Sequence, residues 1–240
     1  MCEMTTTVYK FNELPEIIKE KVLDKQRNIN TDNEWYEFTL DEWKTKLSEK
    51  GFTDAEIFFS GFCSQGDGAC FDARCDVSNL AAAVYSGKDE DFYREVLQLF
   101  ADNGPLVLAR IEKNSYGYHY SHANTRYIYV DKEMSDIEND IQKILMTDLT
   151  QIPAIISEYE GIDSTLSGLV ALRLKYQAQS IDLNDLLNKF ERDADELRKN
   201  LSNAIYKELE QEYDGLISDE SVIETLKCND YEFDEDGDII

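Results

Sequence analysis

Apolar side chains in the first fifty residues recur every three or four positions, the spacing that places them on one face of a helix. This pattern predicts a first helix over residues 12–28, with Asn12 as its N-cap and Pro15 in its first turn. It predicts a second helix from residue 31 or 32 to a stop at Gly51. Both tryptophans of the chain fall in this second segment, where we expect them to anchor a core.

The centre of the chain alternates between short apolar runs and turn signals, as strands do. Residues 56–63 and 69–75 predict two strands joined by a glycine-rich turn. Helical spacing returns over 79–103. A further strand is predicted at 106–111, and two more within 116–130.

Beyond residue 135 the pattern is almost wholly helical, until an Asp-Gly pair near the C-terminus indicates a final tight turn. The chain therefore predicts an α+β fold, in which an antiparallel sheet of about five short strands is covered by helices and followed by a mostly helical C-terminal region. We expect an α+β domain with a glycine-rich hairpin over residues 1–131. A helical region ending in an acidic tail or turn is expected over residues 132–240.

Charge narrows the classes of partner. The chain has 50 acidic and 24 basic residues and a formal net charge of −26, which repels nucleic acid and anionic membranes and attracts basic surfaces. Residues 206–240 alone hold 13 acidic and 2 basic side chains. The carboxylates expected to bind a partner there are Glu208, Glu210, Glu212, Asp214, Asp234, Glu235 and Asp236.

The compartment follows from what the sequence lacks. The first residues show no signal-peptide pattern, and nowhere do 18 apolar residues follow one another. Five cysteines form an odd set without a C-x-x-C spacing, which favours free thiols in a reducing cytoplasm. Long charged helices are compatible with a homodimer, although no sustained heptad requires one.

Two features were weighed as sites. The turn at Ser64, Gln65, Gly66, Asp67 and Gly68 either presents backbone N–H groups to an anion or partner, or is a hairpin whose polar side chains cap their own backbone. The structural alternative is favoured, because no Gly-Lys-Ser/Thr follows and Asp67 opposes phosphate.

The second feature is the pair of histidines, His119 and His122, which are candidate ligand-binding or acid–base groups. On a regular strand, positions three apart point to opposite faces, so the pair is not expected to chelate a metal. The terminal acidic run resembles the opening of a calcium loop, but its twelfth position would lie beyond Ile240. We expect no cofactor and no metal.

The run Phe59-Ser-Gly-Phe-Cys-Ser-Gln-Gly-Asp-Gly-Ala-Cys-Phe71 resembles a pattern, FSGF-x-SQGDGA-x-F, found in a group of uncharacterised proteins common in tailed-phage genomes. The ending from Leu209 to Gly237 is also similar to the usual ending of that group. The resemblance covers roughly residues 8–131 and 205–238. It implies a phage origin and no particular activity.

These observations favour a non-enzymatic, phage-encoded accessory protein that binds and inhibits or modulates a host protein in the host cytoplasm. Its carboxylates would cover a basic surface, such as one of a defence protein or one that otherwise holds nucleic acid. One alternative is an enzyme or small-ligand protein that uses the Ser64–Gly68 hairpin with His119 and His122. Another is an antitoxin-like or scaffolding partner of a second phage protein.

Overall fold

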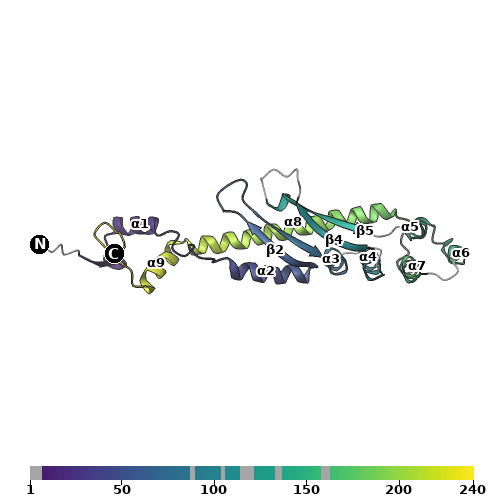
Figure 1. Cartoon of the computed structure of the whole chain (residues 1–240), viewed down its shortest axis with the longest axis horizontal. Coiled ribbons are helices and arrows are strands. Elements are labelled where there is room, and N and C mark those ends of the chain that lie inside the picture. The colour runs from purple at the N-terminus through teal and green to yellow at the C-terminus, as the bar shows by residue number, and fades with distance from the viewer. Residues whose placement is uncertain (1–6, 87–89, 104–105, 114–121, 133–136, 158–162) are drawn as a thin grey trace. The chain divides into compact units, whose positions relative to one another are not determined.

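The computed structural model describes residues 7–86, 90–103, 106–113, 122–132, 137–157 and 163–240. Two compact units make up the chain (Figure 1). Unit 1 contains the described residues up to Leu40 together with Lys207–Ile240, and unit 2 is Asp41–Tyr206. Unit 1 is therefore built from both ends of the sequence, an arrangement that no local pattern indicates.

A four-stranded antiparallel sheet forms the centre of unit 2, in the order β2-β3-β4-β5. The strands are β2 (Phe52–Phe59), β3 (Ala69–Cys75), β4 (Leu106–Lys113) and β5 (Arg126–Lys132). This confirms the antiparallel α+β fold. The fifth expected strand begins within residues 114–121, which lie outside the described residues.

Seven helices contribute to unit 2 as far as the structure describes it, and two of them, α2 and α8, continue into unit 1. Helices α3 and α4 pack against β4, α4 packs against α7, and α7 packs against α5. The helical stretch expected over 79–103 holds two helices, α3 and α4. The bounds are α2 (Glu37–Glu49), α3 (Val77–Val84), α4 (Asp91–Asn103), α5 (Glu138–Met146), α6 (Ile152–Ile156), α7 (Ser164–Tyr176) and α8 (Leu183–Leu216).

Two details explain how these helices pack. Gly51 ends α2 with a φ of +88°, as its sequence predicts, and its carbonyl accepts a hydrogen bond from the Asp76 N–H at 2.8 Å. The buried Arg173 of α7 donates from Nη1 to the carbonyls of Ile144, Leu145 and Thr147 at 2.5, 2.7 and 2.8 Å. Because the last carbonyls of α5 have no partner within their own helix, this guanidinium satisfies groups that burial would otherwise penalise.

Unit 1 joins the two chain ends through a small sheet and a core. Strand β1 (Tyr9–Lys10) pairs antiparallel with β6 (Glu232–Phe233), and α1 (Glu16–Lys25) contacts α9 (Asp219–Cys228). A short 3-10 helix, Phe11–Glu13, precedes α1. The core between them consists of Phe11, Leu14, Val22, Val222, Leu226 and Phe233.

Local patterns were partly right in unit 1. The first helix is confirmed, but Asn12 is not its N-cap, because it lies in the 3-10 helix and Pro15 occupies the N-cap position of α1. The final turn is confirmed: Gly237 has a φ of +81°, and a Cβ there would lie 2.7 Å from Cγ2 of Val22. Of the two tryptophans, Trp43 is buried and Trp35 is half-buried.

Candidate functional site

The glycine-rich hairpin between β2 and β3 is closed by its own aspartate. The Ser60 N–H donates to the Gly68 carbonyl at 3.1 Å. Oδ2 of Asp67 accepts hydrogen bonds from the N–H groups of Cys63 and Ser64, and Oδ1 accepts from the Ser60 hydroxyl. Neither glycine of this turn is among the described residues with positive φ. The N–H groups that an anion would need are thus already engaged by Asp67.

The histidines cannot be joined to this hairpin from the structure. His119 lies outside the described residues, and His122 begins the short 3-10 helix His122–Asn124, with its side chain also outside what is described. Within the described part of the chain, no three His, Cys, Asp or Glu side chains gather in a way that could hold a metal ion. Chemistry at His119 and His122 therefore stays a prediction.

A buried polar cluster lies where α8 meets the 3-10 helix in unit 2. Arg198 is fully buried, and it donates from Nε to Asp195 Oδ1 at 2.7 Å and from Nη1 to the Ala123 carbonyl at 2.8 Å. Burial would raise the pKa of Asp195, but hydrogen bonds from Arg198 and Lys199 hold it below its ordinary value. This pair fixes the entry into β5 and supplies no exposed reactive group.

The cysteines near the sheet are also poor nucleophiles. Cys70 and Cys75 are buried on β3, and burial raises the pKa of the Cys70 thiol and raises that of Cys75 to about 12. Because the thiolate is the reactive form, neither side chain is suited to nucleophilic catalysis at neutral pH. Cys63 and Cys228 are exposed.

The acidic C-terminal segment is folded onto α1. Ion pairs join Lys25 to Asp238 and Lys10 to both Asp230 and Glu232, the latter two at 3.3 and 3.2 Å. Hydrogen bonding to Lys25 lowers the pKa of Asp238. The segment expected as an acidic tail or turn is consequently a turn with a fixed place in unit 1.

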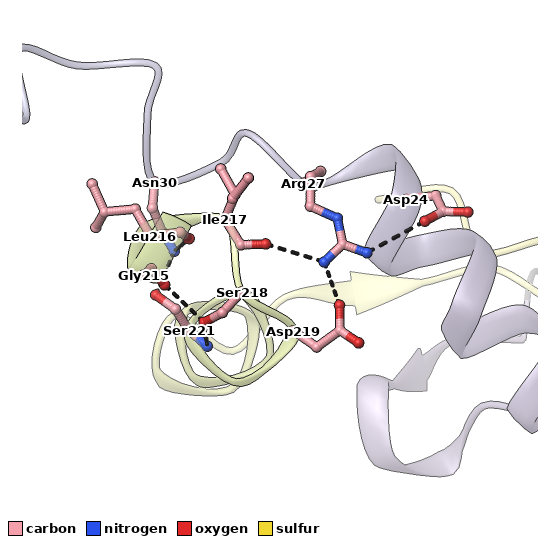
Figure 2. Close-up of polar contacts among 9 residues, drawn as sticks. All are labelled: Asp24, Arg27, Asn30, Gly215, Leu216, Ile217, Ser218, Asp219 and Ser221. Carbon is pink, nitrogen blue, oxygen red and sulfur yellow. Dashed lines mark hydrogen bonds and ion pairs between the residues drawn. The ribbon is translucent and has the colours of Figure 1, made fainter. Parts of the chain in front are cut away.

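A second set of contacts pins the junction between α8 and α9 to the residues after α1 (Figure 2). The Arg27 guanidinium bonds to the Asp219 carboxylate, to the Ile217 carbonyl at 3.1 Å and to Asp24 at 3.4 Å. Hydrogen bonding to Asp219 raises the pKa of Arg27. In Figure 2 the guanidinium lies between the two carboxylates, so it neutralises charge where the chain turns.

The carboxylates predicted to bind a partner divide into three groups. Glu212 accepts a hydrogen bond from the Thr39 hydroxyl, and Asp234 accepts from the backbone N–H groups of Asp236 and Asp238, so both are used within unit 1. Glu208 and Glu210 are half-buried on α8. The side chains of Asp214, Glu235 and Asp236 are exposed.

Two further exposed carboxylates, Glu220 and Glu224, lie one turn apart on α9 and beside the half-buried Ile223. They were not among the residues singled out, although the acidic count over 206–240 includes them. Together with Asp214, Glu235 and Asp236 they form what we call the acidic face. None of these five side chains is in an ion pair in the part of the chain that the structure describes. This face can attract cations without first breaking internal bridges.

Three comparisons place the chain among known proteins. No curated protein and no solved structure matches it. Among the described residues, no helix is both long enough and apolar enough to cross a membrane. The match that exists is to a family model described as "Domain of unknown function (DUF8835)"; it covers residues 35–219 and so includes the helical middle of the chain. The chain belongs to this family.

Proposed function

We propose that the chain is an accessory protein that binds a host protein through the acidic face of unit 1 and thereby inhibits or modulates it. The observation that carries this proposal is that five exposed, unbridged carboxylates sit on a folded scaffold rather than on a loose tail. A fixed array loses less conformational entropy on binding than a flexible one, so more of its attraction appears as affinity.

The partner that fits this face has a basic surface. Negative potential accelerates encounter with a positive patch at low salt and suppresses wrong, acidic partners. Nucleic acid and anionic membranes are not expected to bind directly, because the whole chain carries a net charge of −26. A basic groove that normally holds DNA or RNA is one such surface, and occupation by carboxylates would block it.

The setting of this activity is proposed from the resemblance described above. The FSGF-x-SQGDGA-x-F pattern supports a phage origin, and the host cytoplasm is then where the chain meets its partner. In this setting, host defence and host nucleic-acid metabolism are the classes of target to test first.

The test is an affinity capture of the tagged full chain from nuclease-treated host lysate at low and at moderate salt. We expect a basic protein to be retained at low salt and to be weakened by salt. Neutralising the acidic face (Asp214→Asn, Glu220→Gln, Glu224→Gln, Glu235→Gln, Asp236→Asn) should slow association with that protein by about tenfold or more at low salt.

A matched control variant separates the face from the net charge. It neutralises five exposed unit 2 carboxylates that are in no ion pair within the described structure, and so removes the same charge. We expect it to retain most of the binding. Equal loss in both variants would show that net charge alone acts, and absence of any basic partner at low salt would refute the proposal. The control residues are Glu49, Glu56, Asp102, Asp185 and Glu196.

A further inference from the structure

A cavity of about 520 Å³ lies within unit 1. One wall is a face of α9, formed by Ser221, Thr225 and Asn229, which are spaced four residues apart and so lie above one another. The facing wall comes from the segment after α1 and includes Asn33 and Trp35. Pockets that bind ligands or anchor side chains range from about 300 to 1,000 Å³, so this cavity is large enough for one bulky side chain.

The cavity is lined by no charged residue, although it lies in the most acidic part of the chain. Trp35 and Tyr231 line it, and each presents an aromatic ring there. Ile29 and Tyr231 also pack against the core of unit 1, which holds this wall in place. An uncharged wall with aromatic rings favours an apolar or aromatic occupant.

Polar groups deeper in the cavity already have their partners. Asn30 donates from Nδ2 to the Leu216 carbonyl and to the Ser221 hydroxyl, both at 3.0 Å, and its Oδ1 accepts from the Thr225 hydroxyl at 2.7 Å. Figure 2 shows Asn30, Leu216 and Ser221 together at the turn between α8 and α9. Because the carboxamide of Asn30 is satisfied, an apolar group can enter beside it without leaving that carboxamide unpaired.

Charge returns next to the cavity in sequence. Asp32 and Glu34 flank Asn33, and Glu220 and Glu224 immediately precede Ser221 and Thr225 on α9. All four carboxylates are exposed, and none is in an ion pair among the residues that the structure describes. The cavity therefore combines a neutral interior with acidic neighbours, and we call these four residues the rim.

We propose that this cavity receives an aromatic side chain of the partner that is flanked, in the partner's own sequence, by lysine or arginine. Protein interfaces gain most of their affinity from a few aromatic anchors in desolvated pockets, whereas surrounding charges set the association rate and the choice of partner. The cavity would supply the first term and the rim the second. This inference rests on the proposed function and adds to it the chemistry of the contact.

The test uses the full, ¹⁵N-labelled chain and three synthetic peptides. One has tryptophan flanked by two lysines on each side, the second has glycine in place of the tryptophan, and the third has glutamates in place of the lysines. We expect the first to bind at least about tenfold more tightly than the second, which matches the burial of one aromatic side chain. Resonances of Asn33, Asn229 and the Trp35 indole should shift with the tryptophan peptide.

Two variants locate the binding. Asn33→Trp places a large side chain at an exposed position of the cavity wall and should abolish the preference for the tryptophan peptide. Asn188→Trp, at an exposed position of α8 in unit 2, is the control for adding a surface indole and should keep the preference.

The outcomes separate this inference from the proposed function. If the lysine peptides with tryptophan and with glycine bind equally, the cavity inference is overturned and the acidic face still accounts for binding. If the glutamate-flanked tryptophan peptide binds as tightly as the lysine-flanked one, the rim has no role and the inference is again overturned. Failure of the proposed function would instead appear in the lysate capture, as the absence of any basic partner.

Discussion

The strongest structural prediction concerns Gly51, which joins α2 to β2. Its φ of +88° is a conformation that side chains with a Cβ rarely adopt. A Cβ there would lie 2.6 Å from the backbone nitrogen of Leu80 and 2.9 Å from the carbonyl oxygen of Asp76. Both are backbone atoms of the turn into α3, so neither can move aside by a change of rotamer.

Gly51→Ala should therefore be costly. The left-handed backbone costs about 1–2 kcal/mol for alanine, and forcing extra atoms into a packed site costs about 1–3 kcal/mol. Together these lower the unfolding free energy of unit 2 by about 2–5 kcal/mol, out of a total of about 5–15 kcal/mol for a typical protein. At a urea m-value of about 2 kcal/mol per M, the midpoint should fall by roughly 1–2.5 M.

Urea unfolding in a Trp35→Phe background measures this effect, because the remaining tryptophan, Trp43, is buried and belongs to unit 2. The control is Gly61→Ala, since Gly61 does not have a positive φ and a Cβ there meets only Asp67 Oδ2, at 3.7 Å. We expect the control to shift the midpoint much less. Equal midpoints for Gly51→Ala and the parent would refute the close approach of α2 and α3 at this glycine.

Two further predictions concern titration in unit 2. Because the folded-state pKa of Asp195 is lowered, its contribution to stability is complete above the unfolded pKa of about 3.9 and is lost as pH falls through the folded pKa. The difference in unfolding free energy between the parent and Asp195→Asn should therefore shrink from pH 7 to about pH 2.5, as measured by urea unfolding; a constant difference would contradict the ion pair with Arg198. In native chain at neutral pH, iodoacetamide should label the exposed Cys63 and Cys228 well before the buried Cys70 and Cys75, with site occupancy read by peptide mass spectrometry; early labelling of Cys75 would contradict its burial on β3.

Several elements could be predicted from sequence because their causes are local. The α+β class follows from alternating and helical spacing, and the stop at Gly51 follows from the freedom of glycine at positive φ. The Asp67 cap of the hairpin and the final turn at Gly237 are likewise decided by side chains a few residues apart. The family match adds that this arrangement extends over residues 35–219.

Other features depend on residues far apart in the chain, and no local pattern indicates them. The pairing of β1 with β6 and the ion pair between Lys25 and Asp238 join the two ends of the sequence. A domain boundary at residue 131 stays a prediction, because a change from mixed to helical patterning does not reveal which segments pack together. The sequence by itself determined the secondary structure, the charge and the acidic C-terminal segment. Only the tertiary structure decided which carboxylates are neutralised by α1 and which remain exposed, because burial and ion pairing depend on what the fold brings into contact.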